Sequence, residues 1–231
     1  MKNLGKIIIA VLFFAFTLNV QNAFATHGNY LEGDILKVTA KSGLKLRAEP
    51  SLNSRVFAKM QLGDEVRVLN TLRFDRAQTI ELVEGSWVYV YYNGMEGFAF
   101  DGFLSTLPTP SNEFSLTELI ELNYDVMEAQ DTTYAGEQMK RTKRYQNGIE
   151  VMNYYGEGGG YTEVRLPGIR LSEAYVLCMN TLPEFEDFAK RMRVKRDEDR
   201  NIIEYSSSTD YTEMNVKEDD GVVVISLFSG C

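Results

Sequence analysis

The sequence predicts a small all-β barrel followed by an α+β domain that has an antiparallel sheet and two helices. Short runs of alternating apolar and polar residues, separated by tight turns, fill the first half and are typical of a barrel. Pro108 and Pro110 then stiffen the chain and block helix formation, which indicates a domain boundary. Beyond Ser115, helical spacing and strand alternation both occur, as in α+β domains. The predicted units are a barrel at 33–107, a linker at 108–114 and the α+β domain at 115–231.

The first 25 residues have the pattern of a secretory signal peptide. Lys2 and Lys6 precede an almost continuous apolar run, Ile7–Leu18, and Ala23-Phe24-Ala25 supplies small residues around one bulky position. The run is too short for a bilayer, which needs roughly 20 apolar residues. We therefore expect cleavage of Met1–Ala25, a secreted or periplasmic protein and no stable membrane span after cleavage. A retained N-terminal anchor is the alternative.

The predicted mature protein is acidic. Cleavage removes two lysines and no acid, which changes the formal net charge from −9 to −11. A negative molecule repels nucleic acid on average, so nucleic acid is not an expected partner.

The strand runs of the first half follow one another without a helix between them. They are expected at Ile35–Lys41, Leu44–Arg47, Val56–Leu62, Glu65–Leu69, Trp87–Tyr92 and Met95–Phe100. Leu44 and Leu46 alternate with Lys45 and Arg47, which is the period of a half-buried strand. Asn93-Gly94 between two aromatic-rich runs predicts a hairpin, because both residues tolerate a positive φ.

The order of these motifs resembles the bacterial Src-homology-3 domain. The similar segments are Ser42–Pro50, Gly85–Val90, Asn93-Gly94 and Gly97–Phe100, and together they cover about Val38–Leu104. The resemblance implies a small β-barrel of secreted and envelope proteins that binds rather than catalyses, with peptides or peptidoglycan stems as ligands in some relatives. The C-terminal half resembles no family that we recognise.

An aromatic row on the Trp87–Tyr92 strand is the predicted ligand-binding surface. Trp87, Tyr89 and Tyr91 fall on one face of the strand, and the aliphatic face opposite is the expected core. Exposed aromatic side chains make good contact surfaces. In the alternative, Trp87 covers the end of the barrel and the tyrosines pack under the second domain.

The connection Asn70–Glu84 contributes Arg73 and Phe74 to the predicted ligand-binding residues. It is either a ligand-facing loop or an extended hairpin. The hairpin is favoured by the strand-like residues Thr79, Ile80, Leu82 and Val83.

The C-terminal half begins with a helix. Ser115 is the expected N-cap and Glu118 its capping-box partner. The apolar stripe of this helix consists of Leu116, Leu119 and Ile120 and could continue to Tyr124 and Met127. A second helix is expected from Leu182-Pro183, with Phe185, Phe188, Ala189 and Met192 on one side. Strands are expected at Glu137–Gln146, Ile149–Tyr155, Tyr161–Leu166, Ala174–Met179, Asn201–Ser206, Tyr211–Lys217 and Val222–Phe228.

Cys178 and Cys231 are the two cysteines of the chain. In an oxidising compartment such a pair is a candidate disulfide, which would hold the last residue to the body of the domain. Two free thiols are the alternative.

The residue inventory argues against most catalytic chemistry. The single histidine, His27, lies close to the predicted cleavage site, so no histidine is expected to serve as a base for a serine or cysteine nucleophile. We therefore predict no catalytic residues, no metal site and no cofactor. A hydrolase that uses paired carboxylates stays open, with Glu157 and Glu163 as its first candidates.

The sequence thus predicts a non-enzymatic binding or adaptor protein of the bacterial cell envelope. Its expected partner is an envelope peptide, a glycan stem or a protein. A small carboxylate-dependent cell-wall hydrolase and a purely structural envelope component are the alternatives.

Overall fold

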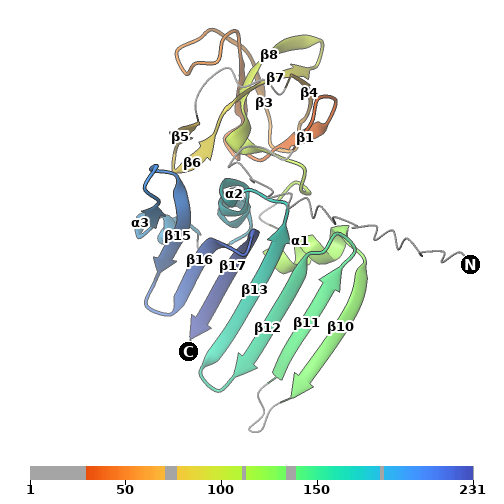
Figure 1. Ribbon diagram of the computed structural model, residues 1–231, viewed down its shortest axis with the longest axis vertical. Helices are drawn as coiled ribbons and strands as arrows, with labels where there is room; N and C mark the ends of the chain where they lie inside the picture. Colours follow the sequence, from red (N-terminus) through yellow and green to blue (C-terminus); the bar gives the residue numbers. More distant parts are fainter. Residues whose placement is uncertain (1–29, 71–76, 111–112, 134–138, 183–184, 231) are drawn as a thin grey trace, which may run out of the picture.

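The computed structural model describes residues 30–70, 77–110, 113–133, 139–182 and 185–230. The predicted signal peptide Met1–Ala25 and His27 lie outside these ranges. Figure 1 shows a β-rich N-terminal unit at the top and a large C-terminal sheet at the bottom, with helix α2 (Leu171–Thr181) between them. The two predicted halves therefore meet at a helix that belongs to the second.

Most strands of the N-terminal unit form one antiparallel sheet, in the order β3-β2-β8-β7-β4-β1-β9. The strands are β1 (Ile35–Val38), β2 (Leu44–Arg47), β3 (Val56–Met60), β4 (Glu65–Asn70), β7 (Trp87–Tyr92), β8 (Met95–Phe100) and β9 (Leu104–Ser105). The predicted hairpin at Asn93-Gly94 is confirmed, because Tyr92 pairs with Met95 and both turn residues have a positive φ. The aliphatic face of β7 is the core side, since Val88 and Val90 are buried.

The prediction of a closed barrel is wrong. The sheet ends at β3 and β9, which do not pair with each other in the described part of the chain. Strand β9 has only two residues and follows a single 3-10 turn, η1 (Asp101–Phe103), so it offers too little backbone for closure. Helix α2 packs against η1 and covers this end of the sheet instead.

The long connection after β4 contains the hairpin that the sequence favours. Strands β5 (Gln78–Ile80) and β6 (Val83–Gly85) pair with each other around Glu81 and Leu82. Both turn residues have a positive φ, 52° for Glu81 and 66° for Leu82. Such a turn matches the right-handed twist of a hairpin, but it is strained for residues that carry a side chain.

The C-terminal half contains an eight-stranded antiparallel sheet in the order β10-β11-β12-β13-β17-β16-β15-β14. The strands are β10 (Val126–Thr133), β11 (Met139–Tyr145), β12 (Glu150–Gly156), β13 (Gly159–Pro167), β14 (Arg193–Arg196), β15 (Ile202–Ser208), β16 (Thr212–Asp219) and β17 (Val222–Gly230). Among the described residues of this half, three helices accompany the sheet rather than the predicted two. They are α1 (Leu116–Asn123), α2 and α3 (Phe185–Lys190).

The predicted capping box of the first helix is confirmed. The Ser115 side chain accepts a hydrogen bond from the Glu118 amide, and the Glu118 carboxylate accepts one from the Ser115 amide. The predicted extension to Met127 is wrong. Tyr124 is the C-cap, and Met127 lies in β10.

The predicted strand Ala174–Met179 is also wrong, because this segment is the middle of α2. A helix that is covered by neighbours on most sides is apolar all around, and a short apolar run of this kind reads equally well as a buried strand. Leu182 is the C-cap of α2, and the predicted second helix begins only at Phe185. Pro183 lies outside the described residues.

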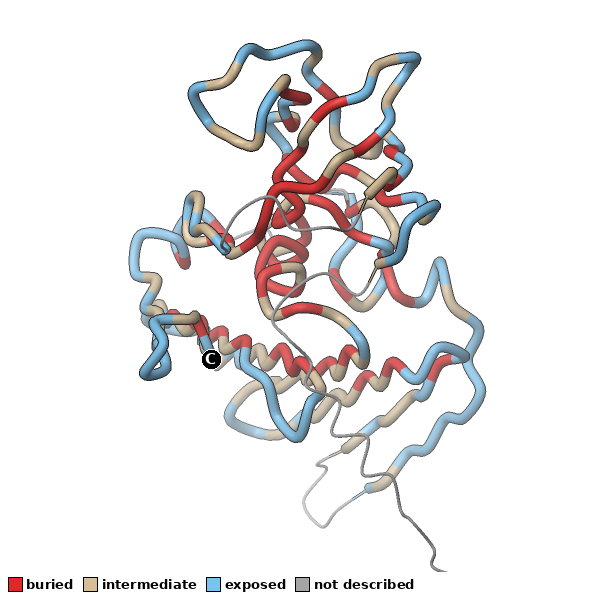
Figure 2. Tube along the Cα trace, turned by 45° about the horizontal axis from the view of Figure 1, so that its top comes forward, coloured by how far each residue is buried: buried red, intermediate tan, exposed pale blue. Residues whose placement is uncertain are grey.

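Helix α2 gives the two halves one continuous core. Buried residues of the N-terminal sheet, of α2 and of the C-terminal sheet belong to a single apolar cluster. Figure 2 shows the buried positions concentrated where α2 lies between the two β-rich parts. On the sheet side, the ring of Tyr175 stacks on Tyr205 of β15 at a centroid distance of 4.1 Å. In the described ranges, no helix has the length and apolar character needed to cross a membrane.

Candidate ligand-binding cleft

The structure divides the predicted aromatic row between two environments. Trp87 is 2% exposed and makes an edge contact with the ring of Phe100, its partner on β8. Tyr89 is half-buried, packs against Phe98 and donates a hydrogen bond to Glu96. Tyr91 is exposed. Arg73 and Phe74 lie outside the described residues.

Trp87 instead lines a cleft between the N-terminal sheet and α2. The cleft has a volume of about 360 Å³. Its walls come from the start of β2, the β5–β6 turn, the rings of Trp87 and Phe100, and the α2 residues Val176, Met179 and Asn180. At its edge, the Lys41 ammonium donates a hydrogen bond to the Met179 carbonyl at 2.8 Å.

Two buried polar atoms in the walls of this cleft have no hydrogen-bond partner among the described residues. They are the indole Nε1 of Trp87 and the side-chain Oδ1 of Asn180. The Asn180 Nδ2 is occupied, since it donates to the carbonyl oxygens of Thr39 and Val176 at 3.0 and 2.8 Å. Buried polar groups in folded proteins are nearly always paired, so an orphan donor and an orphan acceptor in one cleft require an explanation.

Arg47 adds an unbalanced positive charge to the same walls. It is only 7% exposed, and its guanidinium donates to the Ser54 carbonyl at 2.9 Å. Within the described part of the chain it forms no ion pair with a carboxylate. Buried charges are normally paired with an opposite charge. The cleft thus combines a cation, a donor and an acceptor.

Sequence reasoning missed Arg47 and Asn180 for different reasons. Strand alternation places Arg47 on the polar side of β2, but the pairing with β3 shifts register between Leu46 and Arg47 and the side chain is buried. Asn180 lies in α2, and the sequence pattern predicted the middle of this helix as a strand. The i, i+4 spacing of Val176 and Asn180 would have placed them on one face had the helix been recognised.

The strained β5–β6 turn forms part of the cleft wall, through Ile80 and Glu81. The turn is held from outside, because the Tyr205 hydroxyl donates to the Leu82 carbonyl at 2.7 Å. The Glu84 carboxylate accepts from the Ile202 amide at 2.9 Å, and burial raises the pKa of this carboxyl group. Strain of this kind persists only where surrounding contacts impose it, and it is common at binding sites.

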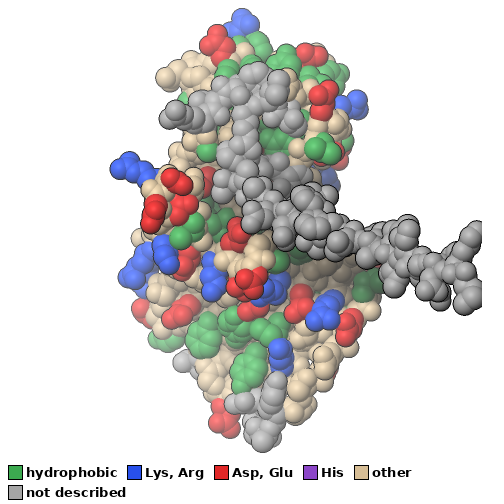
Figure 3. All heavy atoms as spheres, viewed as in Figure 1, with side chains coloured by type: hydrophobic (Ala, Val, Ile, Leu, Met, Phe, Trp, Pro, Cys, Tyr) green, Lys and Arg blue, Asp and Glu red, His purple; other side chains and the backbone are tan. Residues whose placement is uncertain are grey.

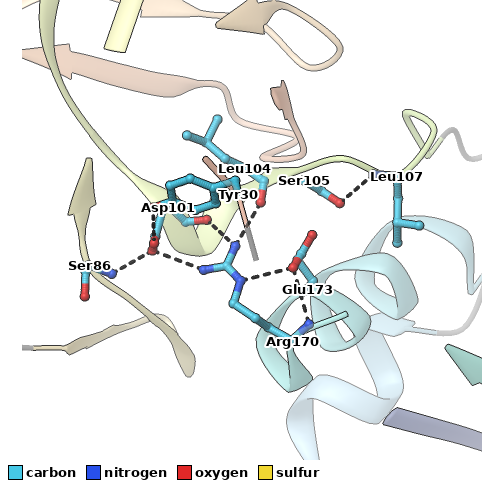
Figure 4. Close-up of polar contacts among 8 residues, drawn as sticks. All are labelled: Tyr30, Ser86, Asp101, Leu104, Ser105, Leu107, Arg170 and Glu173. Atoms are coloured by element: carbon cyan, nitrogen blue, oxygen red, sulfur yellow. Dashed lines mark hydrogen bonds and ion pairs between the residues drawn. The ribbon is translucent and has the colours of Figure 1, made fainter. Parts of the chain in front are cut away.

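A cluster of buried charges lies at another contact between α2 and the N-terminal unit (Figure 4). Arg170, at the N-cap of α2, forms ion pairs with Asp101 at 3.2 Å and Glu173 at 3.0 Å. It also donates to the carbonyl oxygens of Asp101 and Leu104. The Asp101 carboxylate accepts further hydrogen bonds from the Tyr30 hydroxyl at 2.7 Å and the Ser86 amide at 2.6 Å.

The charges in this cluster are mutually compensated. Burial alone would lower the pKa of Arg170, but the Glu173 and Asp101 carboxylates outweigh it and hold that pKa above its ordinary value. Burial, followed by the Asp101 charge, raises the pKa of the Tyr30 hydroxyl. We therefore interpret this cluster as a structural connection rather than a binding site.

Cys178 is a free cysteine in the structure. It is fully buried within α2, and burial raises the pKa of its thiol to about 12. Cys231 lies outside the described residues, so the predicted disulfide is not confirmed. A buried, protonated thiol is a poor nucleophile.

The two carboxylates considered for hydrolysis are separated by the β12–β13 turn. Glu157 is exposed in that turn. Glu163 accepts a hydrogen bond from the Tyr161 hydroxyl at 2.8 Å and pairs with Arg165 at 3.3 Å. Among the described side chains, no group of three or more His, Cys, Asp and Glu residues is arranged to hold a metal ion.

Comparison with known proteins identifies the N-terminal unit. Residues 42–105 match the family model of the bacterial SH3 domain. Neither a curated protein nor a solved structure matches the chain. The matched segment begins just before β2 and ends with β9, so it contains the cleft residues Arg47 and Trp87 but not Asn180. Residues 42–105 are therefore a bacterial Src-homology-3 (SH3) domain, and this match covers less than half of the chain.

Proposed function

We propose that this protein is an exported, non-enzymatic binding protein of the bacterial cell envelope, and that its cleft holds a peptide with a free carboxylate. The observation that carries the proposal is that one cleft combines two polar groups without a partner among the described residues, the Trp87 indole N–H and the Asn180 carbonyl, with a buried guanidinium. That guanidinium belongs to Arg47, which donates to the Ser54 carbonyl but has no carboxylate partner among the described residues. The bacterial SH3 domain supports an envelope role, because modules of this family suggest binding to cell-wall material. Export rests on the signal-peptide pattern of Met1–Ala25.

A peptide terminus satisfies all three groups at once. Its carboxylate would pair with Arg47, its carbonyl oxygens can accept from an indole N–H, and its amides can donate to a side-chain carbonyl. Lys41 and Lys45 also line the cleft, whereas Glu81 is its one acidic lining residue in the described part of the chain. This excess of positive charge favours an anionic ligand. Peptidoglycan stem peptides have this chemistry.

The test is a binding titration of the full-length protein with a soluble stem tetrapeptide that ends in a free carboxylate. Trp87 is the only tryptophan in the chain, so its fluorescence reports directly on the cleft. We expect saturable binding with a change in Trp87 emission. The same peptide with an amidated C-terminus should bind about tenfold more weakly, because it lacks the charge that pairs with Arg47.

Two variants separate the cleft from the outer aromatic surface. Measured by calorimetry, Trp87→Phe should weaken binding about fivefold, because it removes the indole donor and keeps most of the ring. Tyr91→Ala is the matched control, since Tyr91 is exposed on the same strand and does not line the cleft. Loss of binding in Tyr91→Ala alone would move the site to the outer surface. Shortened peptide in the mixture, detected by mass spectrometry, would instead support the hydrolase.

A further inference from the structure

The C-terminal sheet has one face that the helices do not cover. Residues that alternate along its strands point to opposite faces. Val164, Ile225, Val216 and Tyr205 pair across β13, β17, β16 and β15, and they face α2, because Tyr205 stacks on Tyr175. The intervening residues therefore line the opposite face. Figure 3 views the molecule from this side and shows a group of hydrophobic side chains low on the sheet, bordered by charged ones.

Two rows of side chains run across the strands on this open face. The first row is Glu163, Ser226, Asn215, Ser206 and Arg193, which are successive register partners from β13 to β14. The second row is Tyr161, Phe228, Glu213 and Ser208. Eight of these nine side chains, all but Glu163, line a shallow pocket of about 280 Å³. Polar groups thus recur at the spacing of adjacent strands, about 4.8 Å.

The pocket has polar groups that are free to bind a ligand. Asn215 donates through Nδ2 to Glu204 at 2.7 Å, but its buried Oδ1 has no partner among the described residues. The hydroxyl groups of Ser206 and Ser208 form no hydrogen bond with a described residue. The Tyr161 hydroxyl contacts Ser226 at 3.2 Å and Glu163 at 2.8 Å. The pocket therefore offers several short, fixed hydroxyl and amide groups rather than long flexible side chains.

Aromatic surface lies directly beside these groups. Tyr161 and Phe228 are register partners on β13 and β17, and Phe228 is 42% exposed. An exposed aromatic ring next to hydroxyl and amide groups suits a ligand that has both C–H faces and hydroxyl edges. Sugars have this character.

The charges of the pocket balance. Arg193 and Glu213 line it with opposite signs. The Glu163 carboxylate at its border is paired with Arg165. The local charge balance therefore favours a neutral ligand, in contrast to the positive cleft beside Trp87.

We propose that this open face is a second binding site and that it takes an uncharged oligosaccharide. The sugar rings pack on Phe228 and Tyr161, and their hydroxyl or acetamide groups bind the Asn215 carbonyl and the serine hydroxyls. This site lies on the C-terminal sheet and shares no residue with the peptide cleft. It does not depend on the proposed function of the bacterial SH3 domain.

The experiment is a titration of the full-length protein with chitotetraose, an uncharged β-linked oligosaccharide, followed by calorimetry and by NMR. We expect saturable binding with shifts confined to β13–β17 and no change in Trp87 emission. Phe228→Ala should weaken this binding about tenfold, because it removes the exposed ring. Ser206→Ala should weaken it about threefold through one lost hydrogen bond.

Tyr155→Ala is the matched control, since Tyr155 is 52% exposed on β12 and does not line the pocket. It should bind chitotetraose like the parent protein, and Phe228→Ala should bind the stem peptide like the parent. Circular dichroism checks that each variant is folded. The proposal fails if the parent does not bind chitotetraose at millimolar concentration, or if folded Phe228→Ala and Ser206→Ala both bind it unchanged. Saturation of this face by an extended peptide instead would identify it as a protein interface.

Discussion

Helix α2 contacts the SH3 domain in two places that differ in one respect. Around Arg170, the charged groups of both sides are paired with each other and with backbone carbonyls. Around Trp87, one donor and one acceptor have no partner among the described residues, and the Arg47 guanidinium binds a backbone carbonyl but no carboxylate there. Both places are buried, so burial alone does not identify a binding site. The contrast in hydrogen bonding is what supports our proposal for the second place, because polar groups there have no partner among the described residues.

The largest expected effect on the free energy of unfolding comes from breaking the paired charges around Arg170. Arg170→Met should lower the free energy of unfolding by about 3–5 kcal/mol, because it leaves the buried Asp101 charge without its partner. Urea denaturation followed by circular dichroism measures this loss. Arg165→Met is the control, since Arg165 also has two carboxylate partners but is partly exposed, and it should cost less than about 1 kcal/mol. Equal effects of the two substitutions would show that the Arg170 cluster is no structural connection.

A change of pH should have an intermediate effect on the free energy of unfolding, through the buried Cys178 of α2. The Cys178 thiol keeps its proton in the folded state up to about pH 12, whereas the unfolded thiol has a pKa near 9.0. Between these values the unfolded state loses its proton first, so stability falls as pH rises, by about 1.4 kcal/mol per pH unit. Below pH 9 the contribution is fully present.

The measurement compares the parent with Cys178→Ala in reducing buffer between pH 9 and pH 11. The slope of unfolding free energy against pH should be shallower in the variant by about 1.4 kcal/mol per unit, since the buried tyrosines contribute equally to both proteins. Parallel slopes would mean that the thiol of Cys178 is accessible to solvent in the folded state.

The smallest effect on stability is expected from a substitution at Trp87, in the contact that has unpaired polar groups. Trp87→Phe should change the free energy of unfolding by about 1 kcal/mol or less, because the loss of ring area is offset by removal of an unpaired buried donor. Thermal and urea unfolding of the unliganded variant test this. A loss as large as that of Arg170→Met would indicate that the Trp87 N–H has an internal partner, and the contrast between the two contacts would then disappear.

Local patterns predicted several features of both halves correctly. The Asn93-Gly94 hairpin, the Ser115 capping box and the β5–β6 pairing all depend on residues close together in the chain, and all three are confirmed. Alternation along β7 also gave the right core face. It could not show that Trp87 lies under a helix that is about 90 residues away in sequence. Alternation with a period of two residues shows which side chains share a face of the strand, but it does not show which element packs on that face.

The remaining site residues were beyond prediction because they depend on α2. The run around Tyr175 and Cys178 is apolar on all sides, so its hydrophobicity has no helical period. With the helix misread as a strand, neither Asn180 nor Arg170 could be placed. The Arg170–Asp101 pair also joins residues 69 positions apart, and no local rule connects them.

The position of α2 bears on how this SH3 domain could be inherited or engineered. Such domains are often treated as independent units that can be transferred from one protein to another. Here the chain segment that seals the open end of the module, and supplies one wall of its cleft, is encoded more than sixty residues downstream of β9. A fragment that ends at the proline linker would contain the segment that matches the SH3 family but not the α2 residues that line the cleft.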